Sequence, residues 1–106
     1  MKLIYAIINS DDAQKVQNNL TKEGYTVTKL ASTGGFLKVG NTTFLIGVDE
    51  DKVDDVIQII KKYSSKRTQV VPGVNTYSGE FSSVPVQVTV GGATIFVTDI
   101  ERFEKL

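Results

Sequence analysis

The chain has 106 residues, the size of one globular domain, and its twelve Lys and Arg residues balance twelve Asp and Glu residues. It contains neither cysteine nor histidine, which excludes disulfides, the usual zinc sites, thiol nucleophiles and imidazole bases. A chain without net charge lacks the broad positive field that holds nucleic acid or an anionic membrane. We therefore expect a single cytoplasmic domain over residues 1–106, with no nucleic-acid or membrane partner and no signal peptide.

The N-terminal part of the chain predicts a strand followed by a helix. Residues 2–9 form a nearly continuous apolar run, which is typical of a strand buried on both faces at the centre of a sheet. The next residues predict an amphipathic helix, with Ser10 or Asp11 as its N-cap and Gly24 as its C-terminal stop. The apolar face of this helix consists of Ala13, Val16 and Leu20.

The middle of the chain predicts two paired strands and a second helix. Residues 25–31 alternate as a strand does, and residues 42–48 resume a strand after a glycine-containing loop. Residues 49–67 then repeat the helical pattern, with an acidic first turn. The apolar face of the second helix is predicted to contain Val53, Val56, Ile57, Ile60 and Tyr63, and we assign the cations Lys61, Lys62, Lys66 and Arg67 to its C-terminal end.

The C-terminal part contains a long connection and a glycine pair. Residues 68–85 hold both prolines and several small polar residues, which predicts a long irregular connection. Residues 86–98 predict two strands joined in a hairpin at Gly91 and Gly92, and residues 99–106 predict a short helical tail. The order strand, helix, strand, strand, helix, strand is that of the α+β ferredoxin-like fold, the split β-α-β arrangement.

The glycine-containing loop between the two middle strands raises the question of phosphate binding. Residues 35–42 resemble a P-loop, but Asn41 stands where the phosphate-binding lysine is required, and a strand rather than a helix follows. Gly34 and Gly35 can still form a small anion-binding nest of backbone N–H groups, with Phe36 placed against a purine ring and Asn41 reading an adenine edge. The alternative is a plain tight turn with Phe36 in the core.

Other candidate sites have simpler explanations. The carboxylates around Asp49 lack the spacing of a calcium loop and are ordinary partners of a helix N-terminus. Ser82 and Ser83 have no histidine to activate them, and no carboxylate pair has the spacing expected for acid–base catalysis. We therefore expect the protein not to be an enzyme, and we expect no metal and no cofactor.

Three segments resemble the cyclic-di-AMP receptors of the PII-like signal-transduction type from Gram-positive bacteria. The most specific are "TKLA" with "TGGFL" and "GNTTF" in residues 28–44, and "VGGAT" with "FV" in residues 90–97. The resemblance covers nearly the whole chain. It implies a single PII-like domain that forms a homotrimer, binds cyclic-di-AMP at the subunit interfaces and signals to an unknown downstream protein through loop rearrangement.

The resemblance also implies a set of ligand-binding residues. Around one adenine it places Thr28, Asn41 and Gly47, with Phe36 and Leu37 packed on the base. The main chain at Gly35 and Phe36 would face a phosphate, and Thr26 would line the site. The segment from Val71 to Pro85 would be the signalling surface.

Several departures from the family pattern bear on the ligand. Gly24, Tyr25 and Thr26 stand where the family usually has asparagine, phenylalanine and arginine, so an amide and a guanidinium are missing. Lys105 replaces a common glutamine, and the long connection lacks the "PMGG" and "PYPVEV" signatures. Lys38 or Lys105 could restore positive charge. The alternative function is a divergent trimer that binds another adenine nucleotide, or a protein-interaction module without a nucleotide.

Overall fold

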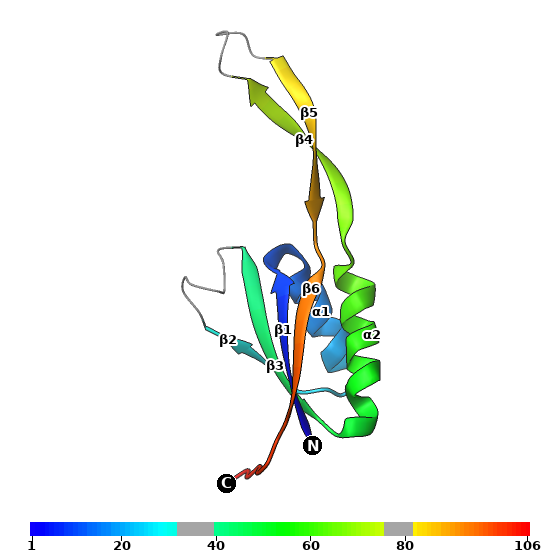
Figure 1. Cartoon of the computed structure of the whole chain (residues 1–106), viewed down its shortest axis with the longest axis vertical. Coiled ribbons are helices and arrows are strands. Elements are labelled where there is room, and N and C mark those ends of the chain that lie inside the picture. The colour runs from blue at the N-terminus through cyan, green and yellow to red at the C-terminus, as the bar shows by residue number, and fades with distance from the viewer. Residues whose placement is uncertain (32–39, 76–81) are drawn as a thin grey trace.

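The computed structural model describes residues 1–31, 40–75 and 82–106. A four-stranded antiparallel sheet carries two helices on one face, and a long two-stranded arm projects from one end (Figure 1). The molecule is therefore elongated, with extents of 62 × 26 × 19 Å. In chain order the elements are β1 (Lys2–Asn9), α1 (Ser10–Lys22), β2 (Val27–Leu30), β3 (Asn41–Val48), a 3-10 turn η1 (Glu50–Lys52), α2 (Val53–Ser64), β4 (Arg67–Asn75), β5 (Ser82–Val90) and β6 (Ala93–Asp99).

The sheet has the strand order β2-β3-β1-β6, and every neighbouring pair is antiparallel. Each helix connects two strands that are separated in the sheet by one other strand, as the split β-α-β arrangement requires. The predicted ferredoxin-like α+β fold is therefore confirmed. The arm is inserted between α2 and β6, so that β6 completes the sheet.

The core lies between the helices and one face of the sheet. On β1, Ile4, Ala6 and Ile8 point toward the helices and are fully buried, together with Val16 and Leu20 of α1, Phe44 and Ile46 of β3, and Val56 and Ile60 of α2. The opposite face of β1 is only half-buried. The prediction that this strand is buried on both faces is therefore wrong for the single chain, because both helices cover the same side.

The helix ends differ in detail from the prediction. The N-cap of α1 is Asn9, whose side-chain oxygen accepts a hydrogen bond from the backbone N–H of Asp11 at 2.9 Å, so neither Ser10 nor Asp11 is the cap. Gly24 follows the helix with a φ of 89°, as predicted for a C-terminal stop. The second helix ends at Ser64, so Lys66 and Arg67 lie beyond it rather than in its last turn.

The connection after α2 is a β-hairpin arm rather than an irregular segment. β4 and β5 pair from Arg67 opposite Val90 to Asn75 opposite Ser82, and residues 76–81 lie outside the described residues. Both prolines fit because each strand of a two-stranded arm is an edge strand, where a missing N–H is tolerated.

The hairpin predicted at Gly91 and Gly92 is wrong, because β5 pairs with β4 whereas β6 pairs with β1. The two glycines, at φ values of 82° and 84°, carry the chain from the arm into the sheet. The extra hairpin of the predicted fold therefore exists, but one strand earlier in the chain.

The predicted helical tail is absent from residues 100–106, which have no regular secondary structure. Pairing with β1 continues to the end of β6, where Lys2 forms an ion pair with Asp99 and the N–H of Ile100 donates to the carbonyl oxygen of Met1 at 3.0 Å. A segment this short is a marginal helix by itself, which agrees with the absence of a helix beyond the end of the sheet pairing.

The base of the arm is held against the body of the domain. The guanidinium of Arg67 makes two hydrogen bonds, of 2.8 and 3.1 Å, to the carboxylate of Asp12, which is 7% exposed. The N–H of Gly92 donates to the carbonyl oxygen of Ser64 at the end of α2. A Cβ at Gly91 would lie 2.7 Å from the Ser65 carbonyl oxygen, so the chain crosses here at a distance that only glycine permits.

A positive φ alone destabilises an alanine by roughly 1 to 2 kcal/mol. We expect Gly91→Ala to lower the free energy of unfolding by clearly more than this, because the added Cβ would also clash with the Ser65 carbonyl oxygen. Urea unfolding of Gly91→Ala and Gly24→Ala tests this. Gly24 has a similar φ of 89°, but a Cβ at Gly24 would meet nothing within 4 Å, so this glycine is the matched control for crowding. Equal losses in the two variants would contradict the close crossing.

The Tyr25 hydroxyl, which donates a hydrogen bond to the Asp55 carboxylate, ties the segment before β2 to α2. This hydrogen bond, together with burial and the nearby negative charge, raises the pKa of Tyr25 to about 12. The hydrogen bond therefore stabilises the fold fully below pH 10, roughly the pKa of an unfolded tyrosine, and this contribution is lost as pH rises through the folded pKa.

We expect Tyr25→Phe to lower the free energy of unfolding by about 1 kcal/mol at pH 7. Chemical denaturation from pH 7 to 12 should show the difference between wild type and variant shrinking above pH 10. A difference that stays constant across this range would contradict the assignment.

Candidate functional site

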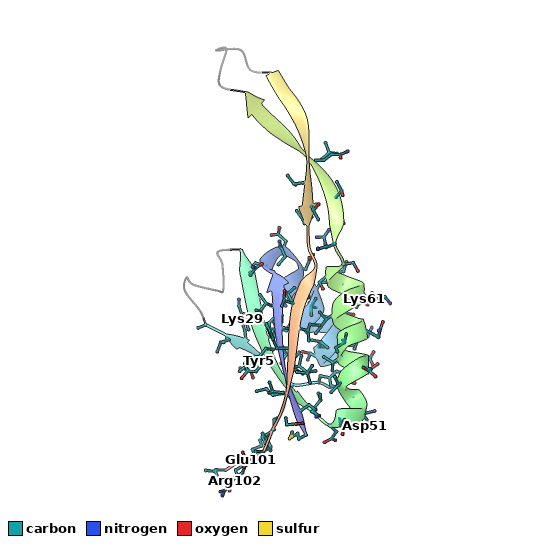
Figure 2. All side chains as sticks on the ribbon, in the orientation of Figure 1. Tyr5, Lys29, Asp51, Lys61, Glu101 and Arg102 are labelled. Carbon is teal, nitrogen blue, oxygen red and sulfur yellow. The ribbon has the colours of Figure 1, made fainter. Side chains whose placement is uncertain are left out.

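The face of the sheet opposite the helices is open in the single chain. The strand register places Leu3, Tyr5 and Ile7 of β1 on this face, beside Leu45 of β3. Leu30 and Phe96, also on this face, are 39% and 47% exposed. The open face therefore offers an apolar surface with grooves at its ends. Figure 2 labels Tyr5, which lies on this face of the central strand β1.

A groove of about 650 Å³ lies at the end of the open face near the two chain termini. Thr26 and Thr28 before and within β2, and Gly47 of β3, line it together, so the structure brings three of the predicted site residues into one place. The remaining lining is formed by Met1, Leu3, Leu45, Ile100, Phe103, Glu104 and Lys105. The volume falls in the range, roughly 300 to 1,000 Å³, of small-molecule sites.

Gly47 keeps this groove open. A Cβ at this position would find only Met1 Cε, at 3.8 Å, which is an ordinary van der Waals contact. The absence of a side chain is therefore not required by packing within the chain. It leaves the backbone of β3 accessible from the groove.

Asn41 lies elsewhere on the open face. It begins β3, whereas Thr28 pairs with Leu45, four residues further along, which is about 13 Å of strand. Asn41 lines a separate pocket of about 310 Å³, the polar pocket, with Asn9, Lys66, Thr94 and the two glycines Gly91 and Gly92. One chain therefore places Thr28 and Asn41 in different pockets.

Gly35, Phe36 and Leu37 lie outside the described residues, so their assignments stay predictions. Lys38, the other cation considered for the site, also lies outside them. Lys105 does line the groove, next to Glu104. Glu104 accepts hydrogen bonds of 2.6 and 3.2 Å from Arg102, so its negative charge is compensated within the tail.

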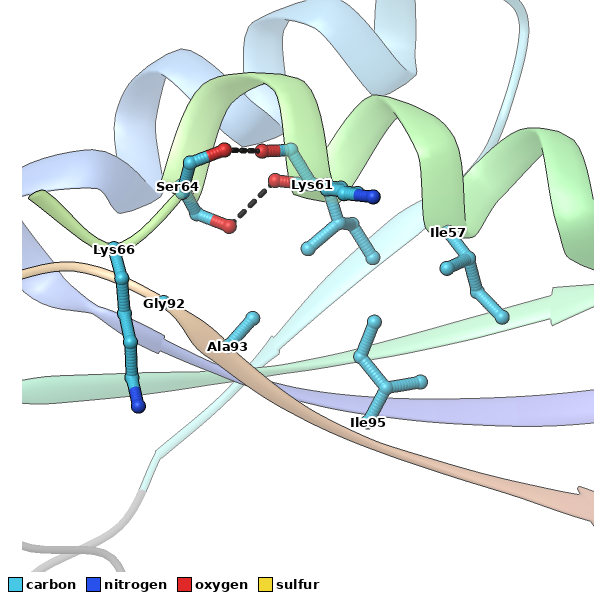
Figure 3. Close-up of a pocket in the computed structure, with 9 residues that line it drawn as sticks. Ile57, Lys61, Ser64, Lys66, Gly92, Ala93 and Ile95 are labelled. Carbon is cyan, nitrogen blue, oxygen red and sulfur yellow. Dashed lines mark hydrogen bonds between the residues drawn. The ribbon is translucent and has the colours of Figure 1, made fainter.

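A third pocket, of about 320 Å³, lies on the helix side between α2 and β6. Figure 3 shows its apolar wall, with Ile57 and Ile95 facing one another across it. None of the predicted ligand residues lines this pocket. In the same view the Lys66 side chain runs past Gly92 and points away from α2.

Lys66 lines the polar pocket, but the sequence alone does not indicate it as a site residue. The sequence places it among four cations at the end of a helix, where a role in binding has no distinguishing signal. The feature that indicates the position of Lys66 is Gly92, because a Cβ at Gly92 would be 3.0 Å from Lys66 Cγ. This proximity exists only once the chain has returned from the arm.

The carboxylates around Asp49 lie in η1 and the first turn of α2. Within residues 1–31, 40–75 and 82–106, no three acidic side chains come together as a metal-binding group would require. No helix in this part of the chain is long and apolar enough to span a membrane.

Comparison with known proteins identifies the class of this fold. The GlnB-like protein 1 of the nitrogen fixation nifHD region of Methanothermococcus thermolithotrophicus is 37% identical over 61% of this chain and 74% of its own length. A crystal structure of a functionally unknown protein from Pediococcus pentosaceus ATCC 25745 matches with a TM-score of 0.77 at 39% identity, covering 99% of this chain and 96% of its own. The protein is a PII-like protein of ferredoxin-like fold.

The family follows from the whole chain. The model of the cyclic-di-AMP receptor family matches residues 1–106. The chain therefore belongs to the cyclic-di-AMP receptor family, as its sequence motifs predict.

Proposed function

We propose that the protein is a cytoplasmic signal-transduction protein that binds cyclic-di-AMP between the subunits of a homotrimer. The observation that carries this proposal is membership of the cyclic-di-AMP receptor family over residues 1–106. A groove of suitable volume, lined by two threonine hydroxyls and apolar side chains, supports it. The apolar part suits an adenine ring, and the hydroxyls can bond its edge or a phosphate oxygen.

The proposed site uses residues of both the groove and the loop. Thr28, Asn41 and Gly47 surround an adenine, Phe36 and Leu37 pack on it, Thr26 lines the site, and the main chain of Gly35 and Phe36 faces a phosphate. Within one chain Thr28 and Asn41 belong to different pockets. Two chains packed through the open face can bring the groove of one chain against the pocket of its neighbour, which supports a site between subunits.

The homotrimer is supported by the open face of the sheet. Leu3, Tyr5 and Ile7 of the central strand are only half-buried in one chain, and Leu30 and Phe96 are more exposed still. An apolar sheet face of this extent is typical of a subunit interface. Association of three chains through it would bury the central strand on both sides, as its composition predicts.

The arm formed by β4 and β5 is the proposed signalling element, and no catalysis is involved. It projects from the body of the domain and is anchored to it at its base (Figure 1). A long projecting hairpin can contact another protein without disturbing the core. Ligand binding at the open face would change the position or order of residues 71–85, and a downstream protein would read that change.

A second candidate is favoured by Gly24 and Thr26. The arginine that the family usually has at residue 26 would supply a charged hydrogen bond, and loss of such a bond costs about 1.5 to 3 kcal/mol. The protein would then bind another adenine nucleotide, or act as an interaction module without one.

Isothermal titration of the purified protein with cyclic-di-AMP tests the proposed function, with cyclic-di-GMP and ATP as controls. We expect selective binding near one ligand per subunit, and sedimentation equilibrium at the mass of three chains. Selective binding of ATP would favour the second candidate. No heat with any nucleotide would contradict the nucleotide-binding function.

We expect Gly47→Val to abolish cyclic-di-AMP binding, because the valine side chain would project into the groove and cover the backbone of β3, while leaving the fold as stable as before. A β-branched residue suits a strand better than glycine, and the nearest atom leaves room for a Cβ. Titration and thermal unfolding of the same sample check both parts. Unchanged affinity would show that the ligand does not occupy this groove.

A further inference from the structure

The polar pocket on the open face is rich in hydrogen-bond donors. Its polar lining comes from Asn9, Asn41, Thr94 and Lys66, and none of the residues that line it is Asp or Glu. Asn9 and Asn41 are direct partners in the β1–β3 register. The Asn9 oxygen already accepts the Asp11 N–H, which leaves the Asn9 Nδ2 group to donate elsewhere.

Lys66 brings a positive charge to this pocket from the other side of the sheet. It follows the end of α2, on the helix face, and its side chain crosses the sheet edge past Gly92 (Figure 3). Its Cγ would be 3.0 Å and its Cε 3.6 Å from a Cβ at Gly92, so the bare glycine backbone is what lets the lysine stem lie across it. A larger residue at this position would displace the stem.

The charge of Lys66 is not neutralised by a carboxylate within the described part of the chain. The ion pairs of that part are Lys2 with Asp99, Arg67 with Asp12, and Arg102 with Glu104. The neighbouring cation Arg67 is therefore used to anchor the arm, whereas Lys66 lines a pocket of amides and a hydroxyl. Donor groups with one cation and no carboxylate favour an anion, and a lysine is a common phosphate contact.

We propose that the polar pocket binds a phosphate of the nucleotide and that Lys66 is the cation that holds it. This inference rests on the proposed function, and it assigns to Lys66 the charge that is missing at Thr26. The pocket is bordered by Gly91 and Gly92, where the chain leaves the arm, and Lys66 directly precedes Arg67, where the chain enters it. A phosphate in this pocket therefore lies next to the residues that directly precede and follow the arm.

The test compares three variants of the 106-residue protein by titration with cyclic-di-AMP. We expect Lys66→Gln to weaken binding by about tenfold to a hundredfold, the usual effect of losing one charged hydrogen bond. Lys66→Arg keeps the charge and should retain most of the affinity. Lys61→Gln is the matched control and should leave affinity unchanged. Both lysines line the helix-side pocket near the end of α2, but only Lys66 also lines the polar pocket.

A second readout uses inorganic pyrophosphate as a probe without a base. In ¹H–¹⁵N spectra we expect pyrophosphate to shift the backbone signals of Gly91 and Gly92 and the side-chain amide signals of Asn9 and Asn41. Lys66→Gln should remove these shifts. A structural role of Lys66 alone would not produce them.

The outcomes separate the pocket from the proposed function. If wild type binds cyclic-di-AMP and Lys66→Gln binds it equally well, the assignment of Lys66 is overturned and the function stands. If cyclic-di-AMP does not bind but pyrophosphate gives Lys66-dependent shifts, the anion pocket stands and the nucleotide function fails. If neither probe moves the four signals, the pocket is overturned.

Discussion

Both helices of this protein lie on the same face of the sheet, and the other features of the molecule depend on that asymmetry. Ile4, Ala6 and Ile8 are completely buried under the helices, whereas the alternate residues of the same strand are half-buried. An antiparallel sheet can leave one face in water, but a central strand that is apolar on both faces exposes an apolar surface unless the second face is also covered. The groove, the polar pocket and the proposed subunit contacts all lie on the face that the helices leave open.

The second constraint is the crossing at the base of the arm. The chain leaves the domain at Arg67 and returns at Gly91, and both points lie against the end of α2. The paired Arg67 and Asp12 hold the outgoing strand, and a buried aspartate in such a pair cannot lose its partner cheaply. Because Gly91 and Gly92 have no side chains, the backbone of the returning chain can lie in close contact with the end of α2 and with the Lys66 side chain. The arm is consequently fixed to the body where the proposed phosphate pocket lies.

Local patterns predict most of the fold. The apolar residues of both helices recur at helical spacing, and the structure buries Val16, Leu20, Val56 and Ile60 as that spacing predicts. Besides details at the helix ends and the tail, the predictions that failed concern the pairing of strands. The connection after α2 could be irregular or form paired strands, and the strand before Gly91 could pair with the strand after it or with β4. Sheet pairing decided both, and strand pairing over long sequence distances leaves little trace in a local pattern.

Spacing, composition and motifs are enough to define the class of fold, the family and the residue types available for binding. They also indicate Thr26, Thr28 and Gly47 as site residues, but only the folded chain gathers these three into one groove. Folding likewise separates Asn41 from them and brings Lys66 beside it, since these positions depend on strand register and on the path of the arm. The sequence near a helix end does not show which side of the sheet a lysine side chain reaches. The neighbours of Lys66 are set only when the chain returns from the arm and passes beside it.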